Sequence, residues 1–359
     1  MSVASTDLTT SAVASALRGR RVDLSGTVFR GALFATLAFT VVVLLTLLVS
    51  VVQDATPIFS GDPVLTEVRS DLVDTSTDPP TITQFGETLP VQVGTDARGR
   101  EIFFQESERS FGDFLTGNVN FTDPAKNGIK QGIFGSIGIA VMVLLFSIPI
   151  GVGAAVYLEE YATANRFTRL VDVNIRNLAG VPSIVYGILG FTVLVTALDG
   201  ITGGRSLISG GITLAILVLP VVIITAAEAI RAVPQEIRMA GYGVGATRWE
   251  VTRYHVLPYA MPGILTGTML SLARALGEAA PLILVGAQTG FFTDPSGVME
   301  RLTGNFTALP MLVFNFTRQP GDVLRIQGAA ATIVILLLVV LVVNATGIIL
   351  RNSFEKKRS

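Results

Sequence analysis

Residues 228–258 read EAIRAVPQEIRMAGYGVGATRWEVTRYHVLP. This stretch, rich in polar residues and glycine, lies between two long apolar segments, 208–227 and 259–289. Connections between packed helices usually need about two to eight residues, so a connection several times longer has a purpose beyond joining its neighbours. We therefore expect a structured loop between two segments that cross a membrane.

The pattern within this loop predicts two short helices separated by a turn. Pro234 suits the first turn of a helix, which we expect to continue to Val244. Three glycines favour a break and let another surface approach the backbone: Gly241, Gly243 and Gly245. Residues 247–256 begin a second short helix, which we expect Pro258 to end. Such a knob can dock in a groove of a partner protein; the alternative is an amphipathic loop that merely lies on the membrane.

The composition indicates that lipid surrounds much of the chain. The mean hydropathy is +0.61 and only 15% of the residues are charged, compared with about 25% in soluble domains. A membrane helix needs roughly 20 mostly apolar residues. Six segments meet this requirement: 31–52, 133–157, 179–198, 208–227, 259–289 and 326–350. The predicted fold class is therefore an all-α polytopic membrane protein with six transmembrane helices.

The residue counts exclude several classes of function. The sequence has no cysteine and one histidine, His255, so disulfides, thiolate metal sites and a Ser-His triad are not expected. A net charge of −1 gives no global attraction to nucleic acid. No Gly-x4-Gly-Lys-Ser/Thr sequence is present, so any use of ATP needs another subunit. We expect a transport subunit with no catalytic residue, metal or cofactor, and not an enzyme.

Arginine and lysine residues place both chain ends on the cytoplasmic side of the cell membrane. They are concentrated in two tails and two loops and are sparse in the short loops between these, as the positive-inside rule predicts. The expected organisation is a cytoplasmic tail 1–30, a first span 31–52, an extracytoplasmic insertion 53–130, a five-span core 131–350 that includes the loop 228–258, and a cytoplasmic tail 351–359.

Two segments outside the spans carry patterns of their own. In the insertion, residues 89–93 and 101–105 alternate as strands do, so we expect a small external subdomain.

Segment 165–178 has apolar residues on one helical face and charged residues mostly elsewhere. It fits either a helix lying along the cytoplasmic membrane interface or an early polar turn of the third span, and the sequence leaves both open.

Residues 239–258 resemble the EAA motif of type I ABC importer permeases. Four residues fit the family pattern: Ala240, Gly245, Leu257 and Pro258. Three depart from it, because Met239 stands where the family prefers Glu, Gly241 where it prefers Ala, and His255 where it prefers Ile. The resemblance implies the type I permease (MetI-like) fold and a loop that docks into an ATPase. The residues assigned to this coupling loop are Met239, Ala240, Gly241, Gly245, Ala246, Trp249, Leu257 and Pro258.

Segments 179–190 (AGVPSIVYGILG) and 273–282 (ARALGEAAPL) resemble the PstA-type permeases of inorganic phosphate importers, over roughly 132–350. The sister PstC-type permeases have a related stretch. The resemblance implies a PstC-like sister permease, a PstB-like ATPase, a PstS-like phosphate-binding protein and phosphate ion as the substrate, in a path surrounded by membrane lipid. Two alternatives stay open: a permease for another oxyanion such as sulfate or molybdate, and a secondary transporter or channel that works alone.

Arg274 and Glu278 are the only charged residues inside the expected spans. Their i, i+4 spacing puts them on one helical face. An unpaired charge at the centre of a span costs at least about 2.5–3.5 kcal/mol, so the pair should face the bundle interior or water. A guanidinium fork suits phosphate oxygens. The hypothesis is that Arg274 offsets anion charge along the path and Glu278 holds it in place; the alternative is a structural ion pair with a polar partner on the sister subunit.

Overall fold

The computed structural model describes most of the chain, in two compact units: Met1–Ser50 and Val51–Ser359. The described residues are 24–61, 63–68, 70–84, 87–95, 101–107, 110–119, 127–163, 165–287, 297–319 and 323–356. Most of the expected N-terminal tail and the last three residues of the C-terminal tail lie outside this part.

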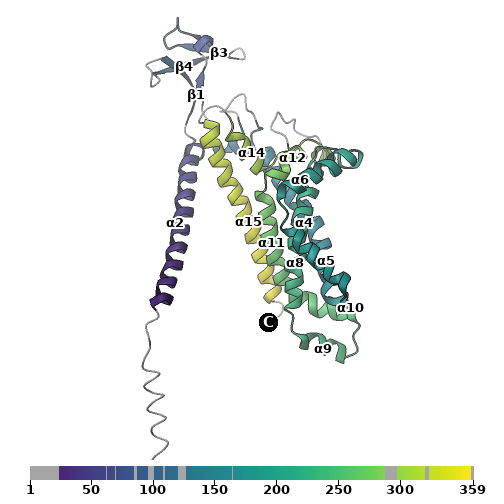
Figure 1. The fold of residues 1–359 in the computed structure, drawn as a ribbon. Helices are drawn as coiled ribbons and strands as arrows, with labels where there is room; N and C mark the ends of the chain where they lie inside the picture. Colours follow the sequence, from purple (N-terminus) through teal and green to yellow (C-terminus); the bar gives the residue numbers. More distant parts are fainter. Residues whose placement is uncertain are drawn as a thin grey trace, which may run out of the picture. The chain divides into compact units, whose positions relative to one another are not determined.

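Among the described residues, five helices are long and apolar enough to cross a membrane, and a bent helix pair makes a sixth span if it counts as one. The long helices are α2 (Leu24–Ser60), α4 (Lys130–Val156), α8 (Leu207–Arg231), α11 (Leu257–Gly277) and α15 (Ala329–Lys356). The bent pair is α5 (Arg166–Ala179) followed by α6 (Ser183–Gly190) with its π-helical continuation to Ala197. These elements confirm a polytopic, mostly helical membrane protein (Figure 1).

Shorter helices join or end these spans. They are α3 (Phe111–Thr116), α7 (Asp199–Thr202), α9 (Gln235–Gly243), α10 (Arg248–Val251), α12 (Ala280–Val285), α13 (Val298–Thr303) and α14 (Leu309–Phe316). A 3₁₀ turn, η1, covers Ser70–Leu72. The described ranges contain four π-helical segments: η2 (Tyr157–Tyr161), η3 (Phe191–Ala197), η4 (Thr252–Val256) and η5 (Val323–Gly328).

Helix α2 is longer than the span expected from the sequence. Over residues 28–50 its side chains are exposed and mostly apolar, and a helix that is apolar on all sides suits lipid. It does not end near Val52. The next two turns bury Ala55 and Ile58 in one cluster with Phe114 of α3. Burying these side chains favours continuation of the helix past the membrane-spanning length.

Helix α8 packs between α4 and α11 in the second unit. A Cβ atom built on Gly151 of α4 would lie 2.7 Å from Val222 Cγ1, and one built on Gly263 of α11 would lie 2.8 Å from Ala229 Cβ. Small residues let helix backbones approach closely in a membrane. Leu214 of α8 is fully buried in the shared core. The glycines therefore determine how near the three helices come.

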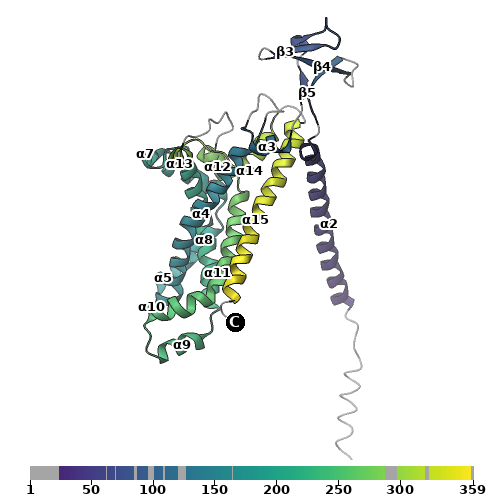
Figure 2. The same cartoon turned by 180° about the vertical axis from the view of Figure 1, so that it is seen from behind.

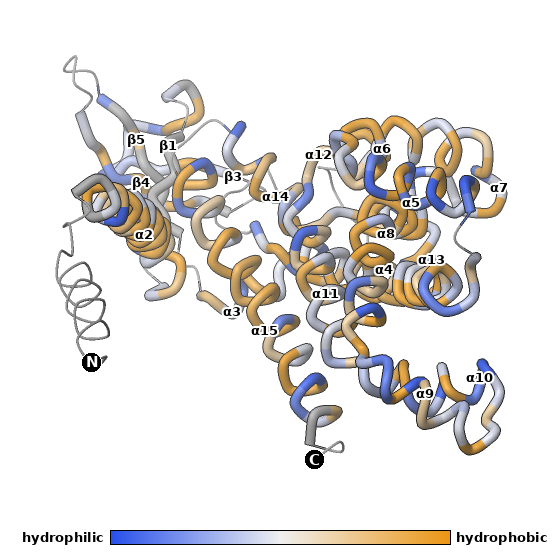
Figure 3. The backbone as a smooth tube through the Cα atoms, turned by 60° about the horizontal axis from the view of Figure 1, so that its bottom comes forward, coloured by the Kyte–Doolittle hydropathy of each residue, from blue (hydrophilic) through white to orange (hydrophobic). Residues whose placement is uncertain are grey.

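The helical core has two different ends. Helices α9 and α10 lie at one end, and α12 and α14 lie at the other, in both views (Figures 1 and 2). Figure 3 shows largely hydrophobic tubes for α4 and α8, and a more hydrophilic stretch over α9 and α10. We call these the loop end and the far end of the core.

The insertion contains a small subdomain, as the sequence predicted. Its antiparallel sheet has the strand order β1-β5-β4-β3-β2. The strands are β1 (Val64–Val68), β2 (Val73–Asp74), β3 (Thr81–Gln84), β4 (Glu87–Thr95) and β5 (Glu101–Ser107). The two expected strands, 89–93 and 101–105, lie within β4 and β5, which pair with Val93 opposite Phe103. Ile82, Val91 and Phe103 form a small buried core on one face.

A sharp bend lies at the start of the segment expected as the third span, 179–198, and separates it from the helix before it. Helix α5 ends at Ala179 and α6 begins at Ser183, with a bend of 98° between α5 and the α6–η3 segment. Pro182 explains the break, because it has no N–H for the carbonyl of Leu178 and disfavours helical backbone in the preceding residue. That carbonyl accepts from the Val181 N–H at 3.1 Å and from the Tyr186 hydroxyl at 2.9 Å instead. Segment 165–178 is thus a separate helix and not an early turn of a continuous span.

Candidate functional site

The segment expected as one long fifth span is also broken. Helix α11 ends at Gly277 and α12 begins at Ala280, while Glu278 between them has extended backbone angles (φ −84°, ψ 110°). Pro281 is the cause, because it cannot donate to the Gly277 carbonyl four residues earlier and its ring clashes with that carbonyl. The segment expected as the fifth span, 259–289, is therefore not one continuous helix; residues 288 and 289 lie outside the described part.

Arg274 and Glu278 lie at this break and form an ion pair. Arg274 Nε is 3.5 Å from Glu278 Oε1, and the two side chains are 49% and 23% exposed. At 1.5 Å per residue, Arg274 lies about 26 Å along α11 from Leu257. The pair is therefore near the far end of the helix. Among the described residues, Arg274 has no hydrogen-bond acceptor, so most of its guanidinium donors are available.

The two broken spans meet beside this ion pair. A Cβ built on Gly187 of α6 would lie 2.7 Å from Pro281 Cα, so α6 packs directly on the first turn of α12. Tyr186, Leu276 and Leu282 belong to one buried cluster. Irregular backbone at membrane depth is tolerated where protein buries it or where it lines a water-filled cavity. Broken helices also recur at substrate sites of transporters, so this junction is the candidate transport site.

The loop between α8 and α11 forms the knob that its sequence predicted. Helix α9 is followed by a turn in which Gly245 has φ +83°, a backbone conformation that strongly favours glycine. Thr247 then caps α10: its N–H and hydroxyl donate to Glu250 Oε2 at 2.7 Å, and its hydroxyl oxygen accepts from the Glu250 N–H. This reciprocal capping fixes the start of the second helix.

The second helix does not end at Pro258, contrary to expectation. It runs through η4 into α11, so Arg248–Gly277 is one helical segment of 30 residues. The Leu257 N–H donates to Thr252 O, five residues earlier. A π-turn of this kind changes the hydrogen-bond register, and it lets the helix accommodate a proline that lacks a donor.

The residues assigned to the coupling loop differ in exposure. Met239, Ala240, Gly245, Trp249 and Pro258 are exposed, Ala246 and Leu257 are partly buried, and Gly241 is buried. A Cβ on Gly241 would lie 2.7 Å from Val251 Cγ2. Glycine in place of the alanine that the family prefers therefore allows α9 to cross closely over the second helix. The apolar side chains of Met239 and Trp249 are 64% and 53% exposed.

A buried ion pair that sequence reasoning missed anchors the knob. Arg238 of α9 donates to Glu160 Oε1 through Nη2 at 2.8 Å and Nε at 3.1 Å. It also donates to the carbonyls of Val233 at 2.6 Å and Ile230 at 2.9 Å. The side chains of Arg238 and Glu160 are 13% and 5% exposed. One arginine thus joins the last turn of α8, the following turn and the end of the α4 helix.

Neighbours of Glu160 add two weaker anchors. Glu159 pairs with Arg231 at the end of α8, and the Arg248 guanidinium lies 5.4 Å from the centre of the Tyr161 ring. The available signal was the sequence YLEEY at the end of the second span, which puts two acidic residues on the same predicted side as the arginines of the loop. The sequence did not show which carboxylate would be buried.

Residues 147–359 match the family model described as the binding-protein-dependent transport system inner membrane component. The chain belongs to this family. The matched region includes the knob, the ion pair and both helix breaks, whereas α2 and the sheet lie outside it. Membership identifies the chain as a multi-pass transport subunit of the ABC importer class.

Two curated relatives and one solved structure illustrate the similarity of this family member to known proteins. It is 35% identical over 234 residues to phosphate transport system permease protein PstA 1 of Mycobacterium tuberculosis, covering 64% of this chain and 73% of that protein. It is 36% identical over 212 residues to PstA of Mycobacterium leprae, covering 58% and 66%. The MetNI methionine ABC transporter structure aligns with a TM-score of 0.47 at 16% identity, covering 63% of this chain and 97% of that one.

Proposed function

We propose that this chain is the PstA-type permease subunit of an ATP-driven importer of inorganic phosphate. The support is the family membership, the relatives named as phosphate permeases and the charged pair at the junction of two broken spans. In this proposal Arg274 lies in the phosphate path. Glu278 holds the guanidinium and limits how tightly the anion is retained.

The main support for the proposal is that, among the described residues, most N–H donors of Arg274 have no protein acceptor. Its only ion pair among the described residues is a single 3.5 Å contact through Nε. Arg238, in contrast, uses Nε, Nη1 and Nη2 on protein acceptors. A guanidinium can bind two phosphate oxygens at once in a planar fork, so Arg274 is suited to an anion and Arg238 to a structural role.

The knob gives the proposed route for energy. Its exposed Met239 and Trp249 would dock into a PstB-like ATPase, and a PstC-like permease would supply the other half of the path. A PstS-like protein would deliver phosphate at the far end. This arrangement places the loop end and both chain termini in the cytoplasm, as the distribution of arginine and lysine predicts. Closure of the ATPase would move the knob and open the path to the other side.

Phosphate uptake by the reconstituted complex tests the role of Arg274. Removing charge-assisted hydrogen bonds worth about 1.5–3 kcal/mol each should lower uptake by at least about 10- to 100-fold in Arg274→Leu. Arg274→Lys keeps the charge without the planar fork, so its uptake should lie between that of the wild type and that of Arg274→Leu. Arg318→Leu is the matched control, because this arginine lies over the Phe314 ring of α14. Copurification of the ATPase with each variant checks assembly.

Three results would contradict parts of the proposal. Full uptake by Arg274→Leu would remove Arg274 from the path and favour a structural pair. Stronger competition by sulfate or molybdate than by phosphate would point to another oxyanion. Uptake by this chain in the absence of any ATP-binding subunit would favour a secondary transporter or channel.

A further inference from the structure

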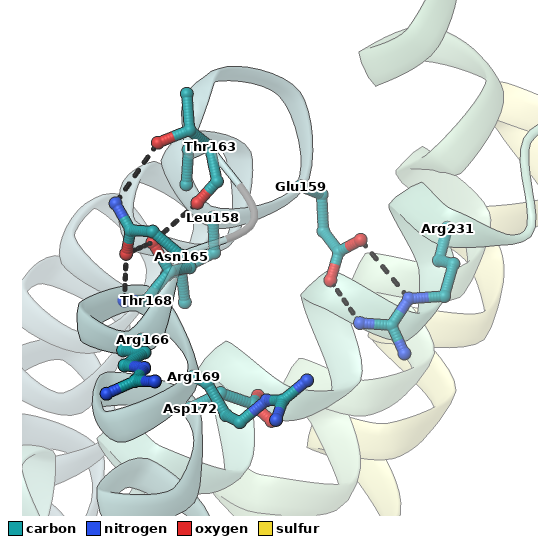
Figure 4. Close-up of a pocket in the computed structure, with 10 residues that line it drawn as sticks. Leu158, Glu159, Thr163, Asn165, Arg166, Thr168, Arg169, Asp172 and Arg231 are labelled. Carbon is teal, nitrogen blue, oxygen red and sulfur yellow. Dashed lines mark hydrogen bonds and ion pairs between the residues drawn. The ribbon is translucent and has the colours of Figure 1, made fainter.

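A cleft of about 630 Å³ opens at the loop end of the core, away from the candidate transport site. Its walls come from η2 and the turn after it, the start of α5 and the last residue of α8 (Figure 4). The lining residues are Leu158, Glu159, Ala162, Thr163, Asn165, Arg166, Thr168, Arg169, Asp172 and Arg231.

The charges in this cleft do not cancel. Glu159 is paired with Arg231, and Asp172 is paired with Arg176 at 3.1 Å. Arg166 and Arg169 are exposed, and neither has an ion pair or hydrogen bond from its side chain within the described part of the chain. Two guanidinium groups are thus left over at one opening, which favours an anion with several oxygen acceptors.

The same helix has an exposed apolar face. Phe167 and Leu170 of α5 are 73% and 58% exposed, and Val173 is 48% exposed. In a chain that crosses a membrane, such a face beside unpaired arginines suits a molecule with a phosphate at one end and hydrocarbon at the other. Basic pockets between membrane helices bind anionic lipid headgroups in this way.

We propose that this cleft binds the phosphate group of an anionic phospholipid in the leaflet at the loop end, with Arg166 and Arg169 as its ligands and the acyl chains along Phe167 and Leu170. The site adjoins the knob anchor, because Glu159 precedes Glu160 in the π-turn that holds Arg238. A bound lipid would stabilise this end of the α4 helix and the start of α5.

Native mass spectrometry of the assembled transporter in nanodiscs provides the test. The probe is phosphatidylglycerol, titrated into phosphatidylcholine discs. Losing two cationic ligands should weaken its binding about 30-fold in Arg166→Gln with Arg169→Gln. Arg176→Gln is the matched control on the same helix, because that arginine is already paired, and it should change binding less than about threefold. Higher salt should also weaken binding by the wild type, because exposed charges are screened.

A second arm distinguishes lipid from free phosphate, which has the same chemistry. Inorganic phosphate is added to phosphatidylcholine discs, and the binding that depends on Arg166 and Arg169 is measured. The lipid assignment would be overturned if inorganic phosphate shows this arginine-dependent binding while retention of phosphatidylglycerol does not depend on the two arginines. Equal retention of phosphatidylglycerol by the wild type and the double variant, with no binding of inorganic phosphate that depends on the two arginines, would overturn the site itself. Neither result depends on transport, so the proposed function is tested separately.

Discussion

Glu160 and Glu159 are adjacent carboxylates that should differ greatly in their importance for the knob. Glu160 is 5% exposed and binds Arg238, which is 13% exposed. Glu159 is 17% exposed and binds Arg231, which is 59% exposed. Glu160→Gln preserves the shape of the side chain and leaves the buried Arg238 without its counter-charge. Glu159→Gln makes the same change one residue away, at a solvated pair, and is the matched control.

The structure sets the size of the expected difference. Removing one partner of a buried ion pair costs about 3–5 kcal/mol, whereas a solvated pair contributes about 0.2–1 kcal/mol. In the Glu160→Gln variant the carbonyls of Ile230 and Val233 still accept from Arg238, so we expect the lower end of the first range. At about 1.36 kcal/mol per factor of ten, opening of α9 should become roughly 150-fold more frequent in Glu160→Gln and at most about fivefold in Glu159→Gln.

Hydrogen exchange measured by mass spectrometry on the purified complex reports this opening. The informative peptide covers α9, Gln235–Gly243, whose amide exchange follows the population of the locally open state. Adding Arg238→Gln to the Glu160→Gln variant should destabilise α9 much less than Arg238→Gln does in the wild type, because the two side chains act as one unit. Equal acceleration of α9 exchange by the Glu160 and Glu159 variants would refute the claim that the buried pair anchors the knob.

Two further substitutions test close contacts. Gly241→Leu should push α9 away from Val251 and reduce substrate-stimulated ATPase activity of the reconstituted complex. Gly243→Ala, where a Cβ meets open space, should leave this activity nearly unchanged. Equal activities of the two variants would exclude a tight crossing of the two knob helices. Tyr186→Phe removes the hydroxyl donor to Leu178 O and should lower the free energy of unfolding by about 1 kcal/mol, seen as a lower thermal midpoint; an unchanged midpoint would show that this hydrogen bond is dispensable.

Hydropathy predicted the existence of the spans because burial of apolar side chains in lipid leaves a long, uniform signal. Local turn chemistry predicted the knob, because its glycines favour a break and residue 247 was expected to begin a second helix. The structure places Gly245 in a left-handed backbone at that break and shows a Thr247–Glu250 capping box at the helix start. The alternation in residues 89–93 and 101–105 predicted β4 and β5 for the same kind of local reason.

Hydropathy did not predict the breaks, since Pro182 and Pro281 are themselves compatible with an apolar segment. Their positions still held the information. Each proline withdraws a donor from the carbonyl four residues earlier, at Leu178 and at Gly277, and both helices end within two residues of that carbonyl. The burial of Glu160 could not be predicted in this way, because it depends on Arg238, which is distant in the sequence and approaches only when α9 packs against the end of the α4 helix.

The continuity of the helix through Pro258 links the knob to the charged pair. Because the helix passes through Pro258, Arg248–Gly277 is one segment of 30 residues, about 45 Å long at 1.5 Å per residue. One end carries the exposed Trp249 of the knob, and the other carries Arg274 at a break where the helix is free to change direction. A displacement of the knob would therefore be carried along one hydrogen-bonded helical segment, through the π-turn at Thr252–Val256, toward the Arg274 backbone. A helix that stopped at Pro258 would not provide this connection. In the proposed importer, this continuity would let an ATPase at one end change the environment of the guanidinium at the other.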